Sequence, residues 1–341
     1  MLKHKVLKLA ALIAKYKIYS WARKPIKTQR KQLKILLKKG ANTVFGQDHK
    51  LYNVDSYNDF KLKVPVRDYE QLKKYFDRIK NGEKNILWPG KPKYFAITSG
   101  TTSGAKYIPI TKDSLPNHLN GAKNALLMYV VNKKTTQFIN GKFIFIQGSP
   151  LLNKINGILS GRLSGISAHH IPFYMKKNML PSWKVNIINE WENKVEKIVE
   201  ETVNENMTVI SGIPSWLQMY FEKISKKSNK NISTTFPNFN LLIYGGVNFR
   251  PYKEKFNSLI GKKIDTIELF PSSEGFFAFQ DRQEKKDLLL ILNAGIFYEF
   301  IDVKNFRQNN HKRISLANVE LNTNYVLIIS TSAGLWGYNT G

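Results

Sequence analysis

The residues best suited to chemistry lie in one short stretch, Thr98-Ser-Gly-Thr-Thr-Ser-Gly-Ala-Lys106. Hydroxyl residues alternate with two glycines, and a lysine closes the run. Glycines let successive backbone N–H groups converge on one point, the hydroxyls add donors, and the lysine adds a compact positive charge. Such a loop suits a polyphosphate. An ordinary Ser/Gly-rich hairpin connection explains the same composition equally well.

The flanks of this stretch predict its local structure. Apolar residues at 94–97 precede it and residues 107–111 follow it, which indicates strand, tight polar loop, strand. The loop differs from the GxxxxGK[ST] phosphate loop, because Tyr107 follows Lys106 and Pro109 disfavours a helix at that point. The sequence therefore predicts a hairpin.

The overall composition is that of a globular protein with a large core. The chain has 341 residues, of which 42% are hydrophobic and 12% aromatic. No apolar run approaches the roughly 18 residues needed to span a bilayer. The absence of cysteine excludes disulfides, thiolate nucleophiles and cysteine-ligated zinc. It also fits a reducing compartment, so a cytoplasmic location is expected.

The formal net charge of +28 suggests anionic partners. Lysines are spread along the whole chain, and no zinc finger, RNP-type strand or basic arm is present, so we expect no specific nucleic-acid partner. A basic protein that binds nucleic acid or an anionic membrane is the alternative from another functional class.

The N-terminal segment has helical periodicity. One apolar stripe is formed by Leu2, Val6, Leu9, Ile13 and Tyr16. This pattern predicts an amphipathic helix that docks on the body of the protein. A basic helix on a membrane surface is the other interpretation.

The remaining pattern predicts an α/β protein with mostly parallel sheets flanked by helices and a β-rich C-terminal part. Three regions follow from it: an N-terminal helical segment over 1–90 that packs on the large domain, an α/β nucleotide-binding core over 91–274, and a β-rich part of the same domain over 275–341. The candidate strands of the core are 142–147, 207–211, 240–244 and 264–270. In such sheets ligands bind at the carboxyl ends of strands.

Two predicted strand ends carry residues that could bind a nucleotide. The glycine pair before Val247 would allow a flat ligand such as a purine to approach, although turn glycines are commoner. After the next strand, Phe270 could stack on a base. A carboxylate beside a phosphate loop is repelled unless Mg²⁺ lies between them, so Glu274 is a candidate metal ligand. A buried Phe and a surface Glu is the simpler interpretation.

Other chemistry has weaker support. Arg162, in a second Ser/Gly loop, could meet a carboxylate, and His169 could line a substrate. The histidines show no HExxH spacing, and there is no GxSxG elbow for a serine hydrolase.

Taken together, these motifs resemble the auxin-responsive-promoter (GH-three) family of acyl-acid amido synthetases, in its bacterial branch. That family belongs to the adenylate-forming superfamily. The resemblance covers nearly the whole chain and rests on the order and spacing of the stretches at 98–106, 245–249, 272–277, 295–300 and 331–341.

The resemblance implies the large N-terminal domain of an adenylate-forming enzyme and a two-step reaction. A carboxylic acid attacks the α-phosphate of ATP to give an acyl-adenylate and pyrophosphate. The amine of an amino acid then takes the acyl group and AMP leaves. Related ligases use the same first step with coenzyme A as acceptor, and this acyl-CoA ligase activity is the second enzymatic alternative.

The resemblance also assigns residues. Phosphate contacts would come from Ser99, Gly100, Thr101, Thr102, Ser103, Gly104 and Lys106. The adenine would be flanked by Gly245, Gly246 and Val247, and the aromatic and Ser-Ser-Glu positions are Phe270, Ser272, Ser273 and Glu274. The catalytic residues would be Lys106, Thr101 and Glu274, with Glu274 meeting Mg²⁺. The acyl pocket is expected near Arg162, His169 and Phe173.

Three departures from the family pattern stand out. Thr98 and Ala105 replace Ser and Glu, and Phe270 replaces the common Tyr, which keeps a stacking face but loses the hydroxyl. The family's last motif continues Tyr-x-x-Gly-Asp, and the sequence ends at Gly341, before that Asp. We therefore expect a longer protein with a mobile C-terminal cap domain, and low activity for these 341 residues alone.

Overall fold

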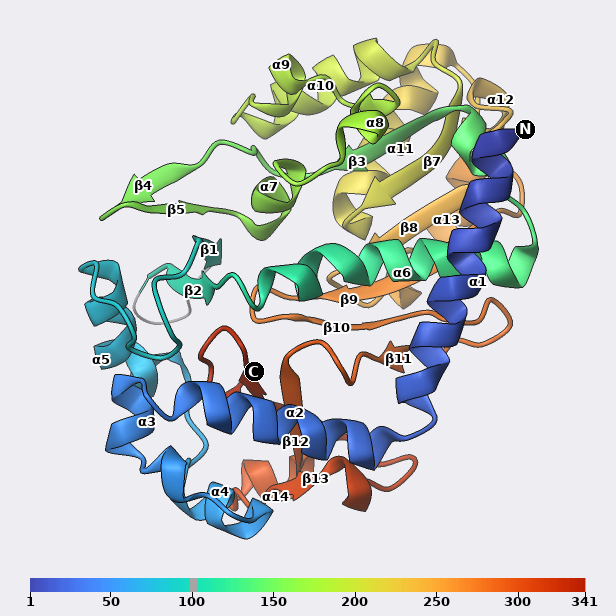
Figure 1. The fold of residues 1–341 in the computed structure, drawn as a ribbon. Helices are drawn as coiled ribbons and strands as arrows, with labels where there is room; N and C mark the ends of the chain where they lie inside the picture. Colours follow the sequence, from blue (N-terminus) through green and yellow to red (C-terminus); the bar gives the residue numbers. More distant parts are fainter. Residues whose placement is uncertain (99–103, 341) are drawn as a thin grey trace.

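The computed structural model describes residues 1–98 and 104–340, which form a mixed α/β fold (Figure 1). Within these residues the strands make up two four-stranded sheets and one seven-stranded sheet. Helices pack around them, and the last strands form a separate antiparallel sheet, as the sequence predicts. No helix in the described part of the chain combines the length and the apolarity needed to cross a membrane.

The N-terminal region is helical, as predicted. Its helices are α1 (Leu2–Ala22), α2 (Pro25–Gly40), α3 (Val44–Asp48), α4 (Tyr57–Lys63) and α5 (Tyr69–Lys80). Two of them begin with reciprocal caps: Ser56 pairs with Asp59 at α4, and Asp68 pairs with Gln71 at α5. Such capping boxes satisfy backbone donors that the first helical turn leaves free.

The predicted docking face of α1 is wrong. The side that packs on the body is formed by Ala11, Ala14, Ile18 and Trp21, which are buried. The stripe from Leu2 to Tyr16 lies on the opposite side and is exposed. The helix has apolar residues on two faces, and small alanines let one of them approach α6 (Leu115–Lys133) closely.

The phosphate-loop candidate connects two strands of the first small sheet. Its strands lie in the order β2-β1-β5-β4, with bounds β1 (Tyr94–Thr98), β2 (Lys106–Ile110), β4 (Asn153–Ile155) and β5 (Ile158–Gly161). The antiparallel register pairs Thr98 with Lys106. The predicted hairpin is therefore confirmed.

The seven-stranded sheet forms the centre of the fold. Its order is β11-β10-β9-β8-β7-β3-β6. The five neighbouring strands β6, β3, β7, β8 and β9 run parallel. The bounds are β3 (Lys142–Ile146), β6 (Met179–Leu180), β7 (Met207–Gly212), β8 (Leu241–Gly245), β9 (Asp265–Pro271), β10 (Phe276–Phe279) and β11 (Leu289–Leu290). The last two strands, β10 and β11, are antiparallel to their neighbours, so the large sheet extends past residue 275.

Helices cover both faces of this sheet. One face packs against α10 (Trp191–Thr202), α11 (Pro214–Ser228) and α13 (Lys253–Ile260). The other face packs against α6, with α1 outside it (Figure 1). The remaining short helices of this part are α7 (Leu163–Ala168), α8 (Phe173–Lys176), α9 (Trp183–Asn186) and α12 (Ile232–Thr235).

The third sheet is antiparallel and has the order β13-β12-β14-β15. Its strands are β12 (Ile296–Asp302), β13 (Ile314–Ser315), β14 (Tyr325–Thr331) and β15 (Tyr338–Asn339), and α14 (Val303–Arg307) follows β12. Buried glutamines attach α2 to β12. Gln29 donates to the carbonyls of Leu292 and Ile296 and accepts from the Tyr298 N–H, while Gln32 accepts from the Gly295 N–H.

A buried ion pair joins this sheet to α4. The Arg313 Nε lies 3.1 Å from Glu299 Oε1, and both side chains are almost fully buried. Tyr57 donates to the same carboxylate, and Arg313 also donates to the carbonyls of Lys61 and Val64. Burial raises the pKa of Glu299 to about 7, while the charge of Arg313 opposes that rise.

Candidate active site

The described end of the hairpin loop is held by α5. Tyr107 donates its backbone N–H to the Tyr69 hydroxyl at 3.0 Å, and the Lys106 Nζ lies 5.9 Å from the centre of the Tyr69 ring. Gly104 has a φ of +91°, a conformation that favours glycine. The predicted phosphate residues Ser99, Gly100, Thr101, Thr102 and Ser103 lie outside the described residues. Tyr69 was not recognised from the sequence, where it reads only as one apolar position of an amphipathic helix.

The predicted adenine residues follow β8, beside the end of β9. The parallel register places Gly245 next to Leu269. A Cβ at Gly245 would lie 2.3 Å from the Leu269 carbonyl oxygen, so only glycine lets the two backbones come this close. Gly246 has a φ of +87°, and Val247 is exposed. The structure therefore brings this segment and Phe270 to the same edge of the sheet.

The Ser-Ser-Glu segment is a tight turn between β9 and β10. The Ser272 N–H donates to the Gly275 carbonyl, and the Ser272 hydroxyl donates to the Glu274 carboxylate. Phe270 is half-exposed and meets Phe277 edge to face at 5.4 Å. The Phe270 side chain is thus partly accessible at the strand end, and its stacking on a base stays a prediction.

Asn117, a residue that the sequence did not single out, fixes the exit of this turn. From the first turns of α6 its amide donates to the Phe276 carbonyl at 3.0 Å and accepts from the Phe276 N–H at 2.7 Å. One turn later, Gly121 lies directly against the Phe276 ring. The helix after the hairpin therefore positions the turn that carries Glu274.

Tyr338 lies in β15, beside the segment that precedes α5. It is almost fully buried, and burial together with the nearby charge of Glu274 and the Tyr69 and Asp68 side chains raises its pKa. Its strand is attached to Arg67, whose backbone exchanges hydrogen bonds with Gly337 and Asn339. The strand that carries Tyr338 is thus attached to a residue two positions before α5, the helix that contacts the hairpin.

Two of the three predicted acyl-pocket residues contact one segment, and the third lies on the surface. Arg162 begins α7, and its side chain lies against Gly148, just after β3. The His169 ring hydrogen-bonds to the Pro150 carbonyl at 2.8 Å and meets Trp183 edge to face. Arg162 and His169 thus contact the same segment, at 148–150. Phe173 is 91% exposed on α8, so the structure brings the first two together and leaves the third on the surface.

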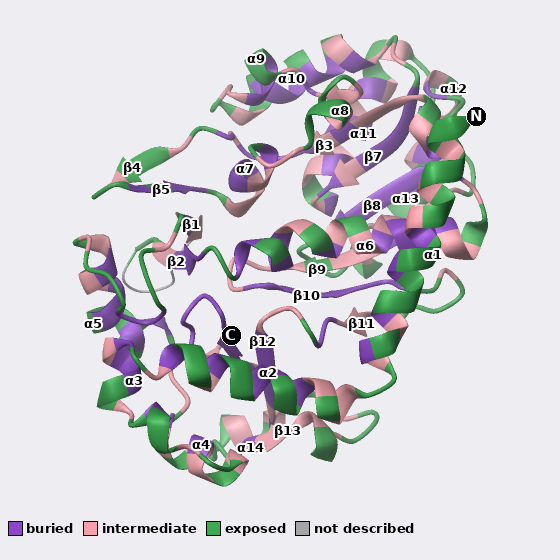
Figure 2. Cartoon of the chain, in the orientation of Figure 1, coloured by how far each residue is buried: buried purple, intermediate pink, exposed green. Residues whose placement is uncertain are grey.

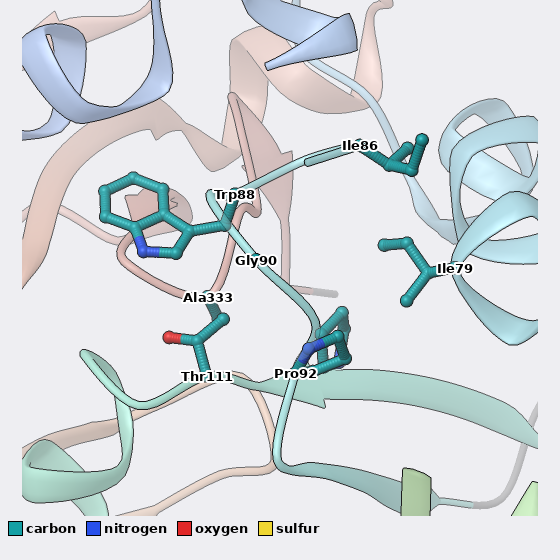
Figure 3. A pocket seen from close by; sticks show the side chains of 8 residues that line it. Ile79, Ile86, Trp88, Gly90, Pro92, Thr111 and Ala333 are labelled. Atoms are coloured by element: carbon teal, nitrogen blue, oxygen red, sulfur yellow. The ribbon is translucent and has the colours of Figure 1, made fainter. Parts of the chain in front are cut away.

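A small cavity lies beneath the hairpin (Figure 3). Its volume is about 10 Å³, and its lining includes Ile79, Trp88, Pro109 and Ala333. A space of this size holds one water molecule at most. It is a packing defect between α5 and the end of β2, and it is distinct from the edge where Gly245 and Glu274 lie.

The side chains present fit Mg²⁺ held jointly with a nucleotide. In residues 1–98 and 104–340 no group of three or more His, Asp or Glu could hold a metal by itself. Mg²⁺ keeps several waters and is commonly bound through one or two carboxylates plus substrate phosphates. Glu274, in the turn between β9 and β10, has the type of oxygen ligand that this role needs.

Comparison with known structures identifies the class of fold. The GH3.15 acyl acid amido synthetase superposes with a TM-score of 0.78 over 98% of this chain and 68% of that protein, at 15% sequence identity. A 2-hydroxyisobutyryl-CoA ligase bound to 2-HIB-AMP and CoA gives a TM-score of 0.60 over 93% of this chain and 63% of the ligase, at 12% identity. The chain therefore shares the fold of these two ligases.

Sequence comparison then gives the family. The GH3 family N-terminal domain matches residues 14–186 and 160–264, and the GH3 family central domain matches residues 289–341. The chain belongs to the GH3 family. A jasmonoyl–L-amino acid synthetase, JAR4 of Nicotiana attenuata, is 22% identical over 92% of this chain, which spans 65% of that relative's length. The indole-3-acetic acid-amido synthetase GH3.15 of Arabidopsis thaliana is 37% identical over 26% of this chain and 15% of its own length.

Proposed function

We propose that this protein is an ATP-dependent acyl-acid amido synthetase. It activates a small carboxylic acid as an acyl-adenylate and transfers the acyl group to the amine of an amino acid. The observation that supports the proposal is the edge of the large sheet where the glycine pair after β8 lies beside the end of β9, which leads through Phe270 into the turn bearing Glu274. A hairpin whose loop ends at Lys106 adds the candidate phosphate contact. The family and fold support it.

The chemistry required is modest and matches these residues. A carboxylate is a poor electrophile at neutral pH, and attachment to AMP turns it into a mixed anhydride with a good leaving group. No covalent enzyme nucleophile is needed, which agrees with a chain that has no cysteine. Catalysis would come from positioning and charge neutralisation.

Each residue has a distinct role in this proposal. Lys106, braced by Tyr69, would meet the phosphates together with Thr101 and the rest of the loop. The glycines at 245 and 246 would give the adenine access to the backbone, and Phe270 would stack on it. Mg²⁺, held by Glu274, would neutralise phosphate charge. We propose a cytoplasmic site of action, where ATP is abundant.

Binding of ATP to the 341-residue chain tests the phosphate site directly. Calorimetric titration should show that Lys106→Ala weakens ATP binding by about 10- to 100-fold, the usual effect of losing a charge-assisted hydrogen bond. Lys112→Ala is the matched control, because Lys112 lies just past β2 and is exposed. Equal affinities of the Lys106 variant and the native chain would refute the assignment.

The acceptor requires a separate measurement. Acid-dependent release of AMP should rise with amino acids and remain unchanged with coenzyme A. The similarity in fold to a CoA ligase makes coenzyme A the competing acceptor. If only coenzyme A raises AMP release, the product is a thioester and not an amide. The proposed adenylation step would then still hold.

A further inference from the structure

The outward face of α1 is a continuous apolar surface, here called the α1 stripe, that the fold leaves uncovered. Its six side chains are 49–78% exposed, and they are Leu2, Val6, Leu9, Leu12, Ile13 and Tyr16. They repeat at helical spacing over more than three turns. Scattered exposed apolar residues are normal, whereas a continuous row marks an interaction surface.

The α1 stripe is bordered by lysines on both sides. Lys8 and Lys15 follow one edge, and Lys3 and Lys17 follow the other. Lys5 lies within the row, close to Leu12, and all five lysines are exposed. No Asp or Glu occurs before Asp48, although residues 1–47 contain 13 of the 53 Lys and Arg residues. An apolar row between cationic rows is the composition of helices that lie at a lipid–water interface, where lysine stems reach along apolar surface to the headgroups.

The neighbouring helix α2 adds a second basic surface. Lys27, Lys31, Lys34 and Lys38 recur every three or four residues, so they share one side of α2, and all are exposed. Figure 2 shows exposed positions of both helices on the near side of the molecule. The lysine row therefore adds exposed positive charge on the helix that follows α1 in the chain.

The helix is held in this orientation before any partner arrives. Ala11, Ala14, Ile18 and Trp21 bury its inner side, and the His4 ring hydrogen-bonds to the Thr136 hydroxyl at 2.8 Å. A preformed helix pays little additional ordering cost on binding. In Figure 1, α1 lies well away from the β1–β2 hairpin, so a partner on the α1 stripe leaves the candidate active site uncovered.

We propose that the α1 stripe and the lysines around it bind an anionic membrane surface, with α1 lying in the plane of the interface. Charge complementarity selects this partner. A second copy of the chain would place lysine rows against lysine rows, because α1 offers no acidic residue for pairing. An anionic lipid surface supplies negative charge for the lysines, and its apolar layer can take up all the side chains of the α1 stripe.

Vesicle co-sedimentation tests the proposal. The native chain should bind vesicles of phosphatidylcholine with phosphatidylserine, release with added salt, and bind phosphatidylcholine alone weakly. Changing Lys5, Lys8 and Lys15 to Gln should weaken binding about fivefold per lysine. The triple variant Val6→Ser, Leu9→Ser and Ile13→Ser should weaken it by roughly tenfold or more.

Matched controls separate lipid insertion from general effects. Leu62→Ser and Leu321→Ser remove exposed apolar side chains elsewhere and should leave vesicle binding unchanged. Because the chain has no cysteine, an environment-sensitive dye can be attached to Leu9→Cys, where its emission should shift to the blue on anionic vesicles. The same dye on Leu321→Cys should show no shift.

Several results would overturn the proposal. These are absence of binding, equal binding to neutral and anionic vesicles, a triple serine variant that binds like the native chain, or a dye at Leu9 that stays in water. Light scattering tests whether a second copy of the chain occupies the α1 stripe instead. If the serine variant turns a dimer into a monomer and no vesicle binds either form, the α1 stripe is a self-association surface. Vesicle binding needs no ATP, so this outcome is independent of the proposed enzymatic activity.

Discussion

Gly121→Ala is expected to destabilise the protein, although the same change stabilises most helices. Gly121 lies inside α6, where alanine usually gains about 1 kcal/mol over glycine. Here the new Cβ would lie 2.3–2.6 Å from three carbons of the Phe276 ring. The ring has little room to retreat, because Phe276 is 4% exposed and its backbone is bound to Asn117. Overpacking costs about 1–3 kcal/mol, so after the helix-propensity gain we expect a net loss of up to about 2 kcal/mol.

Denaturant unfolding of four variants checks this reasoning. Asn120→Ala, at an exposed neighbouring position of α6, should be neutral or slightly stabilising and so reports helix propensity alone. In a Phe276→Leu background the cost of Ala at 121 should largely disappear, giving a coupling energy of about 1 kcal/mol or more. A Gly121→Ala variant more stable than the native chain would show that the Phe276 ring moves freely. The contact would then not position the turn that carries Glu274.

Two further variants test buried charges. Arg313→Met should cost about 3–5 kcal/mol, because it leaves the Glu299 carboxylate buried without its cation. Loss of the Arg313 charge raises the pKa of Glu299 further, so protonation of the buried carboxylate at lower pH should restore part of the free energy of unfolding. The double variant Arg313→Met/Glu299→Gln should show no such recovery. His118 gives the opposite trend: burial lowers its pKa from 6.5 to about 4, so the unfolded chain binds the proton first. The free energy of unfolding should fall by about 3 kcal/mol between pH 6.5 and 4. In His118→Gln this contribution to the pH dependence of the denaturation midpoint should be missing.

Local signals in the sequence predicted much of the fold. Polar residues stand directly before α4 and α5 in the sequence and cap both helices, and such a start is a local signal because a cap is a contact between near neighbours in the chain. Short apolar runs located β3, β7, β8 and β9, since each is buried on both faces of a parallel sheet. The position of Gly245 and Phe270 at one edge of the sheet was predictable too, because the carboxyl ends of neighbouring parallel strands lie at the same edge.

Contacts between distant residues could not be predicted in this way. The periodicity of α1 offered two apolar faces, and only the surface of α6 decides that the alanine side packs inward. The pairing of β10 with β9, the brace of Tyr69 on Lys106 and the bond of Asn117 to Phe276 all join separate segments. Each depends on tertiary geometry that no single stretch encodes.

The attachment of α2 to β12 has a consequence for the order in which the protein matures on the ribosome. Gln29 and Gln32 find their partners at residues 292–298, and the two ends of these hydrogen bonds are 263–269 residues apart. At typical synthesis rates the helix waits on the order of tens of seconds for that strand. Until then its buried amides have only water or temporary partners. The first helices made are therefore among the last to reach their final packing, and a nascent chain carries an exposed, strongly basic N-terminal segment through most of its synthesis.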